Sequence, residues 1–192
     1  MFALTAVLAA CQSAPVPEVR ASFVTSPMLA IRKPADIAVL RVEDGTPARS
    51  AERHLDLMRE LLIRKLPDRR YSPLAATAVD AFVGGISPAA GETVQAPAFL
   101  KRIAGKATED AVLVVRIEEW DEARLMVDRT CQFRLQAAMV ANDGEVLWNG
   151  SMTGAAKAGG LGAAPLGRDA MARSCAEIAM TELVSQLTPR SP

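Results

Sequence analysis

The stretch that decides the fold is Ala111-Val112-Leu113-Val114-Val115-Arg116-Ile117. All of its residues except Arg116 are apolar, and several are β-branched. A nearly continuous apolar run of this length is typical of a strand that is buried on both faces of a sheet. The run therefore predicts the central strand of the fold.

The next strand has one packed side and one side that faces solvent. From Val127 to Met139, apolar residues alternate with polar ones, which is the period of a half-buried strand. Asn142-Asp143-Gly144-Glu145 predicts a hairpin turn, because Asp-Gly supplies the positive φ that such turns need. Residues 146–152 then return as the antiparallel partner.

Strands and helices alternate upstream of the central run. Residues 36–42 are mostly apolar, include three β-branched residues and follow Pro34, which predicts a strand. Residues 48–66 repeat Leu and Met at helical spacing until Pro67 ends the pattern. Further segments are a strand at 70–74, helices at 76–83, 98–106 and 168–187, and loops at 86–97 and 154–167. The sequence predicts an α/β (α+β) fold with a single mixed sheet, parallel in its first half and antiparallel in its C-terminal meander, flanked by helices.

Composition indicates one globular domain and excludes several partners. Half of the 192 residues are apolar and 23% are charged, which is globular composition. Lys plus Arg equals Asp plus Glu, and aromatic residues make up only 4%. Neither a basic field nor a stacking platform for bases is present, so we expect no nucleic-acid partner.

The N-terminus has the form of a bacterial lipobox. Leu8-Ala9-Ala10-Cys11 ends a short apolar run with small residues and a cysteine that can accept diacylglycerol. This predicts a signal peptide over residues 1–10 and lipidation of Cys11. No Lys or Arg precedes Arg20, whereas secretory signals normally begin with positive charge, so we expect the true start codon to lie upstream. The alternative is a buried apolar N-terminus with a chance cysteine.

The residues after Cys11 predict location and domain organisation. Gln12 and Ser13 are not Asp, which favours the outer membrane, with the protein facing the periplasm. The apolar run is too short to span a bilayer, so the lipid would be the only membrane attachment. Prolines within residues 11–33 indicate a flexible tether, followed by one α/β domain over residues 34–188.

Cys131 and Cys175 remain once Cys11 is acylated. An even pair of cysteines in an oxidising compartment predicts a disulfide, which here would join the last helix to the sheet. The alternative is two separate buried thiols.

Catalytic and metal-binding patterns are weak throughout the sequence. His54 is the only histidine and lies among charged residues, which favours a solvated surface position. The glycines of 159–162 lack the Lys of a phosphate loop. The acids of 118–122 fit neither a calcium loop nor a defined carboxylate pair, which favours a solvated strand end. We expect no enzyme, no metal and no cofactor.

Three segments carry a resemblance to a known family. They are Asp36-Ile-Ala-Val-Leu, the run from Asp110 to Asp121 with its Trp120, and Gly144-Glu-Val-Leu-Trp-Asn-Gly. The chain resembles, over residues 34–188, an uncharacterised family of Gram-negative outer-membrane lipoproteins related in fold to the curli-export lipoprotein and to lipoprotein activators of penicillin-binding proteins. The resemblance implies a mixed-sheet domain, a role in the cell envelope and, from ring-forming relatives, a homo-oligomer. It transfers no catalytic residue, and neither the Gly/Ala-rich loop nor the cysteine pair belongs to the family pattern.

The leading hypothesis is a non-catalytic, lipid-anchored periplasmic protein that binds an envelope protein and supports envelope assembly, secretion or transport. One alternative is a periplasmic small-ligand-binding or ABC-transport auxiliary lipoprotein with a pocket near the loops at 86–97 and 154–167. The other is a hydrolase that uses the acids of 118–122.

Overall fold

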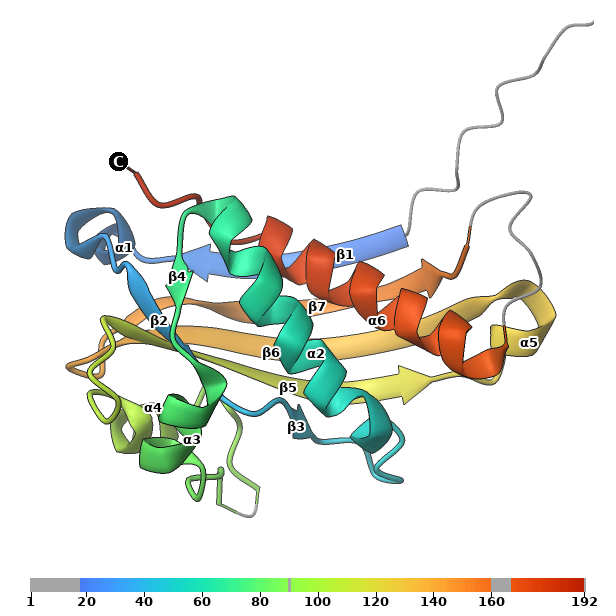
Figure 1. Cartoon of the computed structure of the whole chain (residues 1–192), viewed down its shortest axis with the longest axis horizontal. Coiled ribbons are helices and arrows are strands. Elements are labelled where there is room, and N and C mark those ends of the chain that lie inside the picture. The colour runs from blue at the N-terminus through green and yellow to red at the C-terminus, as the bar shows by residue number, and fades with distance from the viewer. Residues whose placement is uncertain (1–17, 90, 160–166, 192) are drawn as a thin grey trace, which may run out of the picture.

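One mixed sheet organises the chain, and its long helices lie across one face (Figure 1). The computed structural model describes residues 18–89, 91–159 and 167–191. The strands are β1 (Glu18–Thr25), β2 (Asp36–Val39), β3 (Glu43–Asp44), β4 (Ser72–Pro73), β5 (Ala111–Asp121), β6 (Thr130–Ala141) and β7 (Val146–Lys157). The α-helices are α1 (Pro27–Arg32), α2 (Leu55–Lys65), α3 (Ala76–Val83), α4 (Pro97–Ile103), α5 (Leu125–Asp128) and α6 (Arg168–Ser185), with short 3-10 turns at Glu52–His54 and Leu66–Arg69.

The strand order confirms the mixed sheet that the sequence predicts. Within the described ranges the sheet has seven strands in the order β1-β7-β6-β5-β2-β4, with β3 also paired to β5. The pairs among β2, β3, β4 and β5 are parallel, and those among β5, β6, β7 and β1 are antiparallel. β5 therefore separates a parallel half from an antiparallel meander, as its apolar sequence indicates.

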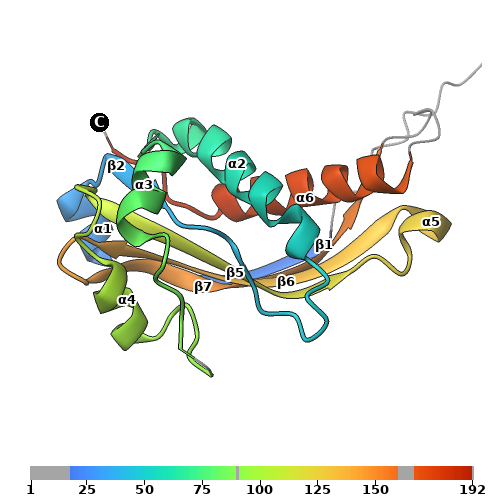
Figure 2. The same ribbon diagram turned by 60° about the horizontal axis from the view of Figure 1, so that its bottom comes forward.

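Two hydrophobic cores lie on opposite faces of this sheet. Leu113 and Val115 of β5 face the larger core, which also contains side chains of α2 and α6. Val112 and Val114 face the smaller core, which contains side chains of α3 and α4. Figure 2 shows α2 and α6 over one face and α4 on the other, at the α1 end of the sheet. Alternation along β5 thus buries both of its faces.

The largest difference from the sequence-based prediction concerns residues 18–32. These residues form β1 and α1, not part of a flexible tether. β1 pairs with β7 along its whole length, and Phe23 stacks on Trp148 with 4.3 Å between ring centroids. Pro27 begins α1, where a missing N–H costs no hydrogen bond. The folded unit therefore begins well before residue 34.

A second difference is the length of β7, which continues to Lys157 through residues predicted to begin a loop. Gly154 and Ala155 pair with both β1 and β6, so small side chains here belong to a strand that has neighbours on both sides. The segments 1–10 and 11–17 and residues 160–166 of the Gly/Ala-rich loop lie outside the described residues. In the part of the chain that is described, no helix is long and apolar enough to cross a membrane.

Candidate functional site

A pocket lies where β2 leaves the sheet and β3 rejoins it. The amide of Leu40 donates to Leu113 O at 3.0 Å, and the amide of Gly45 donates to Ile117 O at 2.8 Å. The chain between these two bonds borders a cavity of about 310 Å³. This volume is at the lower end of the range of small-molecule sites.

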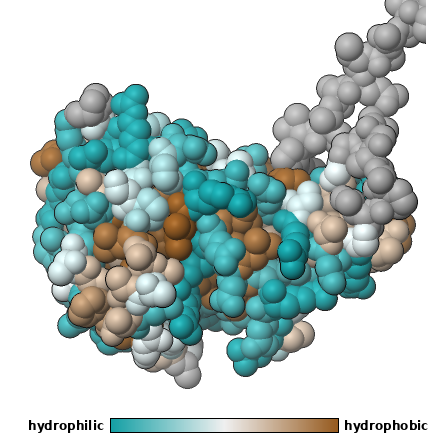
Figure 3. All heavy atoms as spheres, viewed as in Figure 1, coloured by the Kyte–Doolittle hydropathy of each residue, from teal (hydrophilic) through white to brown (hydrophobic). Residues whose placement is uncertain are grey.

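One wall of the pocket is apolar and the other carries charges. The apolar wall comes from α3, α4, β5 and the loop after α3, and its side chains are Val83, Ile86, Val94, Phe99 and Val114. The polar side chains are Arg41, Glu43, Asp44, Arg49, Asp80 and Ser87. In Figure 3 a hydrophobic area lies over α3 at the lower left, within an otherwise polar surface.

Asp80 of α3 is neutralised by two arginines. Arg59 Nη1 donates to Asp80 Oδ2 at 3.0 Å, and Arg41 Nη2 donates to the same oxygen at 3.0 Å. Hydrogen bonds from Arg59 and Arg41 outweigh burial and hold the pKa of Asp80 below its ordinary value. Buried Arg59 also donates to Val39 O at 2.8 and 3.0 Å, so it satisfies the last carbonyl of β2. This group has a structural role that joins α2, α3 and β2.

The carboxylate of Asp44 is likewise occupied, by hydrogen bonds to nearby backbone amides. Its Oδ1 accepts from the amide of Thr46 at 2.9 Å, and its Oδ2 accepts from the amide of Ala51 at 3.1 Å. These bonds fix the loop between β3 and α2. Arg49 in that loop pairs with Glu52 at 3.0 Å.

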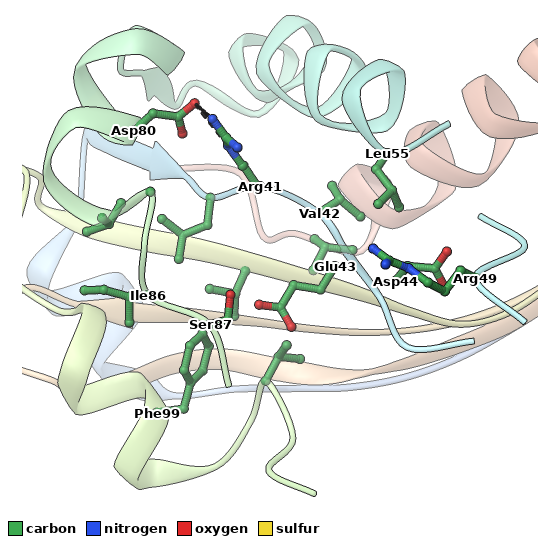
Figure 4. A pocket seen from close by; sticks show the side chains of 16 residues that line it. Arg41, Val42, Glu43, Asp44, Arg49, Leu55, Asp80, Ile86, Ser87 and Phe99 are labelled. Carbon is green, nitrogen blue, oxygen red and sulfur yellow. Dashed lines mark hydrogen bonds and ion pairs between the residues drawn. The ribbon is translucent and has the colours of Figure 1, made fainter. Parts of the chain in front are cut away.

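Glu43 differs from the other acids of the pocket. Its carboxylate reaches Arg116 Nη1 only at 4.0 Å, while Arg116 Nε lies 3.0 Å from Glu118. Burial raises the pKa of Glu43 despite the charge of Arg116. Figure 4 shows its side chain pointing from β3 toward Ser87 and Phe99. A half-buried carboxylate beside an apolar wall suits a ligand with a cationic group and an apolar body.

A second polar cluster, which we call the Glu122 cluster, corrects two expectations from sequence. His54 is buried instead of solvated, and Glu122 is buried although the acids of 118–122 were predicted to be exposed. Glu122 Oε1 accepts from Trp120 Nε1 at 2.9 Å and lies 2.8 Å from His54 Nε2. Arg53 and Arg168 both contact Oε2.

The donors of the Glu122 cluster determine its electrostatics. Burial alone would raise the pKa of Glu122, but hydrogen bonds from Trp120 and His54 and the charge of Arg53 lower it. The carboxylate thus stays ionised and joins the start of α2, the end of β5 and the start of α6. The sequence offered no signal for this cluster, because His54 and Glu122 are 68 residues apart.

The remaining acids of 118–122 do not form a catalytic pair. Glu118 pairs with Arg116 at 3.0 Å, and Glu119 pairs with Arg134 at 2.8 Å. These two acids are therefore each neutralised by an arginine, and Asp121 accepts from the amide of Ala123 at 2.7 Å. Among the residues that the structure describes, no group of three or more His, Cys, Asp and Glu side chains could hold a metal ion.

Cys131 and Cys175 are free, buried thiols that lie close together. Cys175 Sγ donates to Ala156 O at 3.4 Å, and Ala156 is the cross-strand partner of Cys131. Hydrogen bonding with Cys175 and burial both raise the pKa of the Cys131 thiol. The disulfide stays a prediction, and Cys11 lies outside the described residues.

Comparison with known proteins bears on the fold. No protein-family model and no curated protein matches the chain. A subunit of the PelC dodecamer from Paraburkholderia phytofirmans superimposes with a TM-score of 0.50 at 16% identity, over 90% of this chain and 99% of that one. The chain is similar in fold to PelC. This likeness supports the sequence resemblance at the level of the fold.

Two further solved structures are more distant. Lipoprotein GNA1162 from Neisseria meningitidis has a TM-score of 0.45 at 23% identity, over 81% of this chain and 100% of that one. The LpoB C-terminal domain from Salmonella enterica has a TM-score of 0.42 at 15% identity, over 64% and 82%.

Proposed function

We propose that the chain is a non-catalytic interaction protein, anchored to the outer membrane by lipid on Cys11 and facing the periplasm, that supports cell-envelope assembly, secretion or transport. The observation that carries the proposal is the lipobox Leu8-Ala9-Ala10-Cys11, which stands only seven residues before the start of β1. A lipid on Cys11 would hold the folded domain directly at a membrane. The partner would be an envelope protein.

Two features of the described residues support a non-catalytic role. The Glu122 cluster, where a buried histidine meets a carboxylate, is saturated by Trp120 and two arginines, so its acid has no free position for a substrate proton. Nucleophilic catalysis also needs a nucleophile next to the base. In the described part of the chain, the ring of His54 contacts Glu122, Arg53 and Trp120, and none of these is a hydroxyl or thiol nucleophile.

A homo-oligomer is part of the same proposal. The structure with the similar fold is described as a dodecamer, and β1 leaves one sheet edge without a neighbouring strand in the described ranges. An unpaired edge offers main-chain donors and acceptors to a second chain.

Intact mass and membrane fractionation of the wild type and of Cys11→Ala test the anchor. Expression from the natural upstream region should give a mature chain with added lipid mass in the membrane fraction. Cys11→Ala should lose both, while the control Ser13→Ala should retain both. An unprocessed, unlipidated wild-type chain in the soluble fraction would overturn the proposal.

The pocket beside β3 favours a second function, namely binding of a small periplasmic ligand. The half-buried Glu43 makes an organic amine the best match. A panel of amines should raise the melting temperature of the wild type and not of Glu43→Gln, with the exposed Glu60→Gln as control. An equal rise in the melting temperature of all three proteins would mean that the amines bind outside this pocket.

A further inference from the structure

The short helix α5 presents two apolar side chains to solvent at one end of the molecule. Met126 is 62% exposed and Val127 is 82% exposed, whereas the neighbouring Leu125 is fully buried in the larger core. Five large hydrophobic side chains are exposed among the described residues, and Met126 and Val127 are the two that are adjacent in the chain.

The position of α5 is fixed on both sides. Asp128 accepts from Arg124 Nε at 2.7 Å and from the amide of Thr130 at 3.1 Å. Arg129 adopts a positive φ of 63°, and its carbonyl accepts from the amide of Ala158 at 2.8 Å. Together with buried Leu125, these bonds hold Met126 and Val127 outward on a rigid support.

Strand pairing places the start of β1 at this same end. Glu18 pairs with Ala155 near the end of β7, and Lys157 pairs with Thr130, which follows α5 by two residues. Figures 1 and 2 both show α5 at one end of the molecule and α1 at the other. β1 runs from Glu18 to Thr25, and these seven steps span about 23 Å between the α5 end and the α1 end of the strand.

Chain length limits how far Cys11 can lie from the start of β1. Cys11 precedes Glu18 by seven residues, and seven residues span at most about 25 Å. A lipid on Cys11 would therefore connect the domain to the bilayer through the start of β1, at the end of the sheet that carries α5.

We propose that the tip of α5, formed by Met126 and Val127, rests on the lipid surface and sets the orientation of the domain. This inference rests on the proposed lipid anchor. Two apolar side chains are too small for a protein interface, which buries about 800 Å² per partner. A bilayer accepts an isolated apolar pair, and a tether raises its effective concentration at the surface. Arg129 follows the pair by two residues and suits lipid phosphates.

Fluorescent labels at the two ends test the inference directly. Val127→Cys and Ile31→Cys place a polarity-sensitive label on α5 or on α1, where Ile31 is 69% exposed. Cys131 and Cys175 are buried and should remain unlabelled in the folded protein. The lipidated full chain is reconstituted in phosphatidylethanolamine–phosphatidylglycerol vesicles that contain nitroxide lipids.

We expect about threefold stronger quenching at position 127 than at position 31, since an interfacial contact buries side chains several ångströms deep. The label at position 127 should also emit at shorter wavelength. A label on Met126→Cys should also be quenched. The same label on the double variant Met126→Cys/Val127→Glu should not be quenched. Equal quenching at 127 and 31 would overturn the inference.

A second experiment tests the α5 contact independently of the lipidation of Cys11. A hexahistidine tag replaces residues 1–11 and binds nickel-chelating lipids, so the chain is held at the same point without acylation. Quenching confined to position 127 supports the α5 contact even when Cys11 proves unlipidated. No quenching at either position on vesicles that carry the bound protein refutes the α5 contact and leaves the anchor standing.

Discussion

Glu122 is the residue through which α2, β5 and α6 are connected. It accepts from Trp120 and His54 and pairs with two arginines. Glu122→Gln keeps the shape of the side chain but removes its charge. We expect a free energy of unfolding about 2 kcal/mol lower in urea titrations, because hydrogen bonds to a buried charged group are lost.

The matched control is Glu119→Gln, whose side chain is exposed and pairs with Arg134. It should change the free energy of unfolding by less than about 1 kcal/mol. Equal effects of the two variants would show that the Glu122 cluster contributes no more than a surface ion pair.

The same residue gives the stability a defined pH dependence. The pKa of Glu122 and that of Asp80 are lowered in the folded protein. Their stabilisation is therefore present above the unfolded pKa values of about 4 and is lost as pH falls through the folded values. Urea midpoints should decrease from about pH 5 downward, and the decrease should be smaller in Glu122→Gln. A parallel decrease in both proteins would assign the effect to other acids.

The cysteine pair yields a redox prediction. Cys131 and Cys175 are buried side by side between β6 and α6. Oxidation should join them, with an intact mass lower by two hydrogens and a free energy of unfolding about 3–4 kcal/mol higher in the chain-entropy model. Cys175→Ser should abolish the redox-dependent difference. Two alkylated thiols in protein purified from the periplasm would contradict the pairing.

Among the elements, β1 depends on close approach to β7. A Cβ at Gly150 would lie 2.1 Å from Ser22 O and 2.6 Å from Phe23 Cα. Gly150→Ala should therefore displace β1 and lower the free energy of unfolding by about 1–3 kcal/mol. Gly85→Ala is the control, since no atom lies within 4 Å of a Cβ there. Proteolysis within residues 18–25 should increase only in Gly150→Ala.

Strong local patterns made most elements predictable from sequence. The apolar run of β5 and the alternation of β6 each reflect burial that the chain itself encodes. β1 was missed because its alternating pattern is short and lies among prolines, and only pairing with β7 makes it a strand. The Glu122 cluster was missed for a related reason, since its members meet only through tertiary contacts.

At the scale of the whole molecule, the folded unit includes β1 and α1. A chain that begins at residue 34 lacks the strand that covers β7, the ring of Phe23 on Trp148 and the buried Leu29. It should be less soluble and should show a lower urea midpoint than a chain that begins at residue 18. Equal urea midpoints for the two chains would mean that residues 18–33 add nothing to stability.

The pairing of β1 with β7 also has a mechanical consequence. β1 is the first described element after Cys11 and runs along the sheet with all eight residues paired to β7. A pull on the N-terminal side of Glu18, directed along the strand, loads this ladder in shear, so its hydrogen bonds share the force instead of opening one at a time. β1 is therefore suited to bear tension that reaches the domain from its N-terminal side.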